Sequence, residues 1–154
     1  MFINIEGGFQ TMVISVASDH AGYGLKEAIK NYFDINGITY IDFGTNSTES
    51  VDYPIYAKKV CASIQTGESD FGVLVCGTGI GMSIAANKHR NIRAACCSDT
   101  YSAKMARLHN DANVVTLGSR VTGSGLALEI IKQFLSADFE GGRHSGRLNM
   151  LDTL

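Results

Sequence analysis

Cys76 is the residue whose type and setting could do chemistry most directly. It follows the apolar run Phe71–Val75 and precedes the glycine-rich segment Gly77–Gly81, which leads into a short helical pattern. A thiol beside a helix N-terminus is favoured as a thiolate, and a thiolate can act as a base or a nucleophile. On position alone, a small buried core cysteine is an equally good interpretation.

The glycine-rich segment predicts a loop that binds an anionic group. Gly77, Gly79 and Gly81 allow a sharp turn whose backbone N–H groups can face a phosphate, a carboxylate or an enediolate. A tight connection without a ligand is the plain alternative. A dinucleotide fingerprint is a weaker one, because its third glycine position is occupied by Met82, although Asp99 lies where a ribose-binding carboxylate would be expected.

The elements that must position these residues alternate along the chain. Apolar runs predict five strands, at Val13–Ala17, Ile38–Phe43, Phe71–Val75, Ile92–Cys97 and Val114–Leu117. Helical patterns lie between and after them, around Leu25–Phe33, Pro54–Ile64, Met82–Lys88, Thr100–Leu108 and Ala127–Leu135, and a polar tail follows from Gly141. This order predicts an α/β, three-layer Rossmann-like fold with a five-stranded parallel sheet and helices on both faces.

In such sheets a ligand binds beyond the carboxyl ends of the strands. Asp19 and His20 follow the first predicted strand, and the Cys76 loop follows the third. His109 and Asn110 instead precede the fifth strand, so they would reach that edge only by folding back or from a partner subunit. This mismatch is a first indication of a site shared between two chains.

Composition limits the class of protein. The 154 residues are 45% hydrophobic and 18% charged, which predicts one packed domain over residues 12–154. Residues 1–11 are interpreted as an N-terminal extension or a cloning remnant. The net charge of -2 argues against nucleic-acid binding, and the apolar runs are too short to span a membrane. Four cysteines without a C-x-x-C pair favour a cytoplasmic protein with free thiols, and Cys61 and either Cys96 or Cys97 are expected in the core.

Taken together, the motifs resemble the type B ribose-5-phosphate isomerases and their relatives, the galactose-6-phosphate isomerase subunits. The matching segments run in order from Met12 to Arg147: Ser18–Gly22, Asp52–Pro54, Cys76–Lys88, Ile92–Ala95, His109–Asn113, Leu117–Val121 and Gly141–Arg147. No one of these motifs is specific alone, but the ordered set is.

The resemblance implies an aldose–ketose isomerase that works without a metal or an organic cofactor. It implies Cys76 as the base that moves a carbon-bound proton, Thr78 as a relay between two substrate oxygens, and His109 as the group that opens the sugar ring. Asp19 and Asn110 would orient the sugar, and the loop N–H groups would stabilise the enediolate.

The resemblance also implies a phosphate-binding set and a shared site. His20, Arg120, Arg143 and Arg147 are the cations that would bind phosphate, and the arginines of the last pair share a face if the tail is helical. The remaining substrate-binding candidates are Tyr53, Gly77, Gly79, Ile80 and Gly81. Type B enzymes are homodimers with active sites built by both subunits, and pairing into tetramers is left open. No role is assigned to His144, and His89 is expected at the surface.

Three functions follow from these observations. The first is interconversion of ribose 5-phosphate and ribulose 5-phosphate. The second is the same chemistry on galactose 6-phosphate, allose 6-phosphate or a four-carbon sugar phosphate. The third is a non-catalytic nucleotide-binding domain of the same fold. The presence of Cys76, Thr78 and His109 favours a catalyst, and that of Cys76 favours the pentose enzyme.

Overall fold

The computed structural model describes residues 2–3 and 9–154. Its centre is a five-stranded parallel sheet of β3 (Val13–Ser18), β4 (Thr39–Asp42), β5 (Phe71–Cys76), β6 (Ala94–Cys96) and β7 (Val114–Gly118), in the order β4-β3-β5-β7-β6. Two short strands, β1 (Phe2–Ile3) and β2 (Phe9–Gln10), pair antiparallel with each other, apart from this sheet. The predicted α/β fold with a five-stranded parallel sheet is confirmed.

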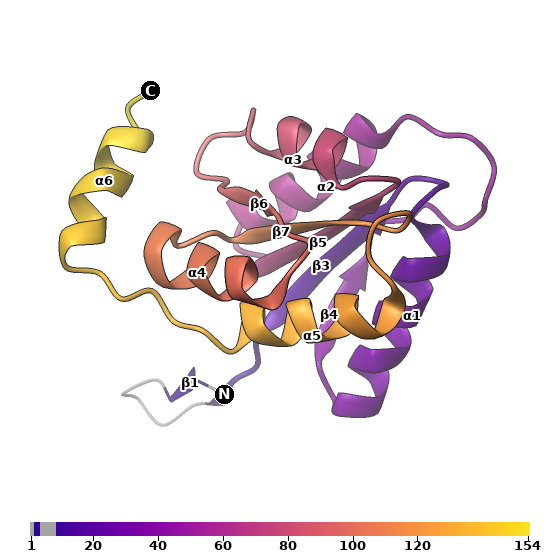
Figure 1. Cartoon of the computed structure of the whole chain (residues 1–154), viewed down its shortest axis with the longest axis horizontal. Helices are drawn as coiled ribbons and strands as arrows, with labels where there is room; N and C mark the ends of the chain where they lie inside the picture. The colour runs from indigo at the N-terminus through magenta and orange to yellow at the C-terminus, as the bar shows by residue number, and fades with distance from the viewer. Residues whose placement is uncertain (1, 4–8) are drawn as a thin grey trace.

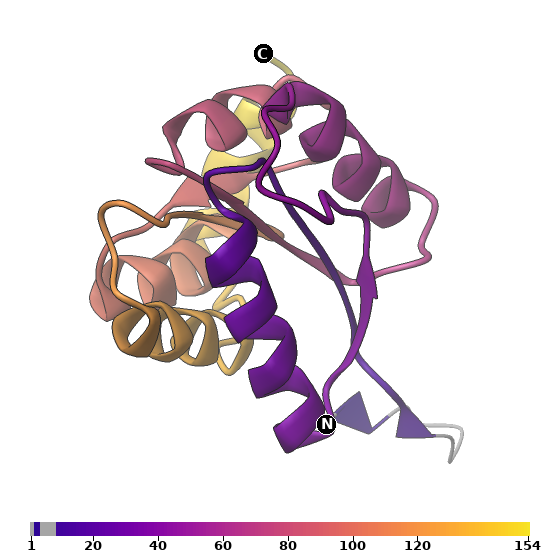
Figure 2. The same ribbon diagram turned by 90° about the vertical axis from the view of Figure 1, so that its right-hand side faces the viewer.

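Helices cover both faces of the sheet. The helices α1 (Tyr23–Asn36), α4 (Thr100–Asn110) and α5 (Ser124–Leu135) pack on one face, and α2 (Tyr53–Gln65) and α3 (Ile80–Ala86) pack on the other (Figures 1 and 2). The last helix, α6 (Arg143–Leu151), lies beyond α4 on the side of the molecule away from α1 (Figure 1).

The apolar alternation of β5 divides the core into two parts. Val73 and Val75 belong to the cluster under α1, α4 and α5, whereas Leu74 and Cys76 belong to the cluster under α2 and α3. Successive side chains of a strand point to opposite faces, so a strand buried on both faces is apolar throughout. The side chain of Cys76 therefore lies on the face that carries α2 and α3.

The sheet order places a topological switch point at the carboxyl ends of β3 and β5. These two strands are neighbours, but the chain leaves β3 toward β4 at one edge and leaves β5 toward the β7-β6 edge. Loops that diverge from adjacent parallel strands leave room for a ligand between them. Ser18-Asp19-His20 and the Cys76 loop are the segments that lie there.

Several predicted boundaries differ from the observed ones. Two strands are shorter than predicted, β4 at Thr39–Asp42 and β6 at Ala94–Cys96. The helix after the glycine loop begins earlier, at Ile80, because Gly79 takes the last non-helical conformation, with φ at +79°. The predicted polar tail is wrong in part, since it folds as α6 and buries His144 and Leu148.

Candidate active site

Cys76 lies at the end of β5, directly beneath the glycine loop. Its side chain is buried, with 4% of the residue exposed, and its sulfur accepts a hydrogen bond from the backbone N–H of Gly79 at 3.1 Å. Sulfur accepts such a bond best when it carries negative charge. The loop thus provides a donor for a thiolate in a setting from which most water is excluded.

The loop can take this shape only because of its glycines. A Cβ on Gly79 would lie 2.9 Å from the carbonyl carbon of Leu117, and its φ of +79° is one that other residues rarely adopt. The Thr116 hydroxyl, on β7, donates to the carbonyl oxygen of Gly79 at 2.8 Å. Packing against β7 therefore fixes the donor that faces Cys76.

Thr78 and Ile80 form the exposed rim of the loop. The Thr78 hydroxyl accepts a hydrogen bond from the N–H of Ile80 at 3.3 Å, and both residues are exposed. A shallow pocket of about 240 Å³ lies beside them; its lining includes Cys96 and Val121 but not Cys76. The hydroxyl of Thr78 is thus presented to solvent on the open side of the loop.

Asp19 and His20 stand next to the same loop, just after the end of β3. The N–H of Asp19 donates to the Val75 carbonyl at 3.1 Å, and its carboxylate accepts from the N–H of Gly22 at 2.9 Å. His20 accepts from the N–H of Val51 through Nδ1 at 3.2 Å. That acceptor nitrogen carries no proton, so the imidazole can donate from Nε2.

Arg120 and Tyr53 pack directly on the glycines. An added Cβ on Gly77 would lie 3.4 Å from Nη1 of Arg120, and one on Gly81 would lie 2.9 Å from the ring of Tyr53. The N–H of Arg120 also donates to the Gly77 carbonyl at 3.0 Å. The structure therefore brings these predicted site residues together at one edge: Asp19, His20, Tyr53, Cys76, Gly77, Thr78, Gly79, Ile80, Gly81 and Arg120.

The other predicted residues lie elsewhere in the chain. His109 and Asn110 end α4, shortly before β7 begins at Val114, whereas Cys76 pairs with Gly118 at the far end of that strand. Four strand steps separate these ends by about 13 Å. The chain therefore does not bring its own His109 to its own Cys76.

Arg143 and Arg147 belong to this second group. Both are exposed on α6, one helical turn apart, and α6 packs against α4 near its end. Because this segment is helical, the two arginines share one face of α6. His109, Asn110, Arg143 and Arg147 thus form a separate set of polar groups without a sulfur or a glycine loop.

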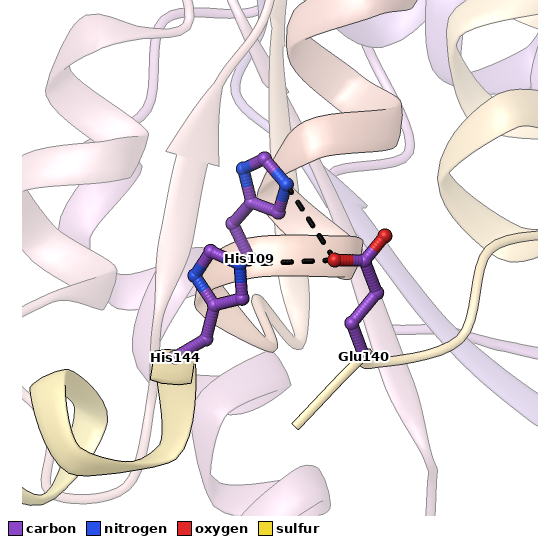
Figure 3. A group of neighbouring side chains, drawn as sticks. All are labelled: His109, Glu140 and His144. Atoms are coloured by element: carbon purple, nitrogen blue, oxygen red, sulfur yellow. Dashed lines mark ion pairs between the residues drawn. The ribbon is translucent and has the colours of Figure 1, made fainter. Parts of the chain in front are cut away.

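His144 and Glu140 are members of this second group that the sequence did not identify. The imidazoles of His109 and His144 are stacked, with centroids 4.3 Å apart and planes 10° apart. The Glu140 carboxylate lies 3.8 Å from Nε2 of His109 and 3.7 Å from Nε2 of His144 (Figure 3). Glu140 and His144 are four residues apart, a spacing that indicates a possible pair on one helical turn. No pattern in the sequence connects this pair with His109.

Burial lowers the pKa of His144 below its ordinary value, and the nearby charges of His109 and Arg143 lower it further. The residue is 6% exposed. Its imidazole is therefore held neutral around pH 7, in the form that can accept a proton or ligate a metal.

Cys61, Cys97 and Asp99 have structural roles. Cys61 and Cys97 are buried, as expected for core residues, and burial raises the pKa of each thiol to about 11. Cys96 is exposed. The Asp99 carboxylate caps α4 by accepting from the N–H of Ser102 at 2.7 Å, which accounts for its position without a dinucleotide. Among the residues that the structure describes, no helix is both long and apolar enough to cross a membrane.

Comparisons with known proteins identify the family. A model of the family described as Ribose/Galactose Isomerase matches residues 14–151. Ribose-5-phosphate isomerase B of Escherichia coli is 47% identical over 141 residues, covering 92% of this chain and 95% of that protein. A D-erythrulose-4-phosphate isomerase of Pectobacterium atrosepticum is 47% identical over 130 residues, covering 84% and 86%. The solved structure of a ribose 5-phosphate isomerase from Thermotoga maritima matches with a TM-score of 0.92 at 52% identity, over 94% of this chain and all of that one (100%). The motif resemblance is thus confirmed, and the chain belongs to the ribose/galactose isomerase family of sugar-phosphate isomerases.

Proposed function

We propose that this isomerase interconverts ribose 5-phosphate and ribulose 5-phosphate through an enediolate, with Cys76 as the base. The observation that carries this assignment is the sulfur of Cys76 at the carboxyl end of β5, 3.1 Å from the N–H of Gly79. This position lies at the carboxyl ends of the strands, where the ligands of parallel sheets bind. The N–H groups of the same loop stabilise the charge that the base creates.

Each proton that moves in this reaction has a donor and an acceptor in the site. Ring opening moves the anomeric hydroxyl proton to His109 and returns a proton to the ring oxygen. The Cys76 thiolate removes the proton from C2 of the aldose, and the electron pair moves through the C1–C2 bond to the C1 oxygen. Thr78 transfers a proton from the C2 oxygen to the C1 oxygen, and Cys76 returns its proton to C1.

The distribution of the site residues supports a shared site. His109, Asn110, Arg143 and Arg147 lie away from the Cys76 edge of their own chain, so a second protomer must supply them. Exposed apolar side chains stand beside the loop for such a contact: Ile80 and Ile84 on α3 are 56% and 57% exposed, and Val121 is 61% exposed. The functional unit is therefore a homodimer in which His109 of the partner subunit reaches the Cys76 loop.

The phosphate is held by groups from both sides of this interface. Arg120 and the Nε2–H of His20 flank the loop on one protomer, and Arg143 and Arg147 come from α6 of the other. The one-turn spacing of the α6 pair directs two guanidinium groups toward one anion. The Asp19 carboxylate then accepts hydrogen bonds from the sugar hydroxyls, and the Asn110 amide donates to them or accepts from them.

All four cysteines are free thiols, and catalysis requires Cys76 to stay reduced. This need fits an enzyme of the cytoplasm, where thiols are kept reduced.

A four-carbon sugar phosphate is the second candidate substrate. It is favoured by the 47% identity to a protein named for D-erythrulose 4-phosphate. One carbon more or less in the substrate changes binding by only about 1–3 kcal/mol, so closely related substrates can compete.

A coupled assay over four-, five- and six-carbon sugar phosphates, with metal removed by chelation, tests the assignment. We expect the highest kcat/KM with ribose 5-phosphate. A higher kcat/KM with a tetrose or hexose phosphate would transfer the assignment to that sugar. No turnover of any of them by a folded dimer would favour the non-catalytic domain.

A further inference from the structure

His109, Glu140 and His144 gather three metal-ligating side chains at one point. His109 comes from the last turn of α4, His144 from the first turn of α6, and Glu140 from the segment that precedes α6 (Figure 3). Their candidate ligand atoms all lie within 4.8 Å of one another. The N–H of Glu140 donates to the carbonyl of Leu108 at 3.0 Å, which ties that segment to α4.

The donor set and the spacing suit a tetrahedral cation. Two imidazoles and one carboxylate are a ligand set that zinc uses when it keeps a fourth position open. Bonds of about 2.0–2.2 Å to such ligands place the ligand atoms about 3.3–3.6 Å apart in a tetrahedron. The distances from the Glu140 carboxylate to the two Nε2 atoms, 3.8 and 3.7 Å, are only slightly longer.

An unsatisfied buried atom points independently to a missing ligand. Nε2 of His144 is buried and has no hydrogen-bond partner among the described residues, although the residue is only 6% exposed. Buried polar atoms nearly always have a hydrogen-bond partner. A buried nitrogen without one, beside two further metal-ligating side chains, is therefore a reason to look for an ion. This atom faces the Glu140 carboxylate (Figure 3).

Two features oppose the ion, and both can be accommodated. The stacked imidazoles hold their Nε2 lone pairs in nearly parallel planes, so the rings must tilt toward each other to share a metal. The side chain of His109 is 36% exposed and has room for that rotation. Arg143 and Arg147 also repel a cation, since their charges act on His144 and lower its pKa. A phosphate bound by these two arginines, as the proposed function assigns, would offset that repulsion.

We propose that His109, Glu140 and His144 bind a divalent transition-metal ion of the Zn²⁺ type, and that the bound ion inhibits the isomerase. Inhibition follows because an Nε2 that ligates a metal cannot exchange a proton with the sugar. The ion is therefore an inhibitor rather than a cofactor of the proposed reaction. The binding stands on the cluster alone, whereas the inhibition rests on the proposed role of His109.

Binding is tested on the metal-free full-length protein by titration with Zn²⁺ against a chromogenic chelator. We expect one ion per chain at this site. Glu140→Gln and His144→Asn should each weaken the binding at least about tenfold, because each removes a direct ligand. His89→Asn is the matched histidine control, and Cys76→Ser and Cys96→Ser are controls for thiol binding; all three should keep the wild-type affinity.

Zn²⁺ affinity that is unchanged in both Glu140→Gln and His144→Asn would overturn the site, as would binding lost in a cysteine control. The Glu140 side chain is 51% exposed, so Glu140→Gln tests the site even if His144→Asn does not fold. Co²⁺ provides a second readout: the absorption of the wild-type complex should be that of a tetrahedral nitrogen–oxygen site, without a thiolate band.

Inhibition is measured separately, with ribose 5-phosphate as substrate. Zn²⁺ should inhibit the wild-type enzyme at the concentrations that fill the site, and EDTA should restore turnover. Full turnover with the site occupied would overturn the inhibition and the ring-opening role of His109, while the ion site would stand. An absence of turnover before metal is added would contradict the proposed function and leave the binding result unaffected.

Discussion

The backbone N–H of Gly79 points at the sulfur of Cys76, with the nitrogen and the sulfur 3.1 Å apart. Gly79 has its φ at +79° and precedes the first residue of α3. One turn therefore fixes the sulfur, its hydrogen-bond donor and the start of a helix in a single unit. A thiolate formed at Cys76 is stabilised by a group that does not need to move.

Replacing the sulfur tests the base. Cys76→Ser should lower kcat by about 10²- to 10⁴-fold, the usual contribution of a general base, while KM and the thermal midpoint stay near wild type. Cys61→Ala, which removes a buried thiol from α2, is the control and should keep wild-type turnover. Near-normal turnover by Cys76→Ser would mean that another residue moves the carbon-bound proton.

The conformation of Gly79 has a matched control in Gly67. Both glycines have positive φ, +79° and +76°, but an added Cβ meets Leu117 at 2.9 Å at Gly79 and nothing within 4 Å at Gly67. Gly67→Ala should cost about 1–2 kcal/mol of stability and leave turnover unchanged. Gly79→Ala should cost more and also lower kcat, because it displaces the donor that faces Cys76. Equal effects of the two variants on kcat would mean that the position of the Gly79 N–H does not affect catalysis.

Much of the fold was predictable because strand and helix periods are local. β5 reads as a continuous apolar run, and the structure buries Val73, Leu74 and Val75 on the two faces of the sheet. Strand order was not predictable, since the pairing of β7 between β5 and β6 depends on packing rather than on any local pattern. The Cys76 loop was identified because its residues are consecutive.

The group of residues around His109 was harder to predict. The end of the chain reads as polar, and Leu148 and His144 are the only residues that α6 buries. The burial of His144 depends on its contact with His109, a residue 35 positions earlier on another helix. A pattern within one segment cannot reveal a contact of this kind, so His144 and Glu140 were missed.

Asp42 is predicted to be a main electrostatic contributor to stability. Its carboxylate pairs with Nζ of Lys26 at 2.7 Å and of Lys30 at 2.8 Å, and Lys26 is fully buried. Asp42→Asn should lower the free energy of unfolding by about 3 kcal/mol, since it leaves a buried ammonium short of its counter-charge. Glu27→Gln, at a more exposed partner of Lys26, should cost no more than about 1 kcal/mol in the same urea titration.

The same carboxyl predicts an acid dependence. Burial alone would raise the pKa of Asp42, but hydrogen bonds from Lys26, Lys30 and the Gly44 N–H hold it below its ordinary value. As the pH falls, the unfolded chain therefore takes up a proton at Asp42 before the folded chain does. The stability that the ionised Asp42 carboxylate contributes is lost as the pH falls below about 4. Asp42→Asn should flatten that part of the stability profile, and a slope equal to wild type would exclude the effect.

His144 predicts a second pH dependence in a different range. Burial and the charges of His109 and Arg143 lower its pKa, so below about pH 6.5 the unfolded chain binds this proton more readily than the folded one. Stability should decline from pH 7 to pH 5, with EDTA present to remove metal. His144→Gln should reduce that decline, and His89→Gln should not; parallel profiles for all three proteins would contradict the assignment.

The most direct test of the shared site mixes two inactive variants. Cys76→Ser and His109→Asn are unfolded together and refolded at equal concentrations, and ribose 5-phosphate turnover is compared with that of each variant alone. Random pairing makes half of the dimers mixed, and each mixed dimer has one site with both Cys76 and His109 intact. We expect recovery to about a quarter of wild-type activity. No recovery, with mixed dimers confirmed by native mass spectrometry, would contradict a site built from Cys76 of one protomer and His109 of the other.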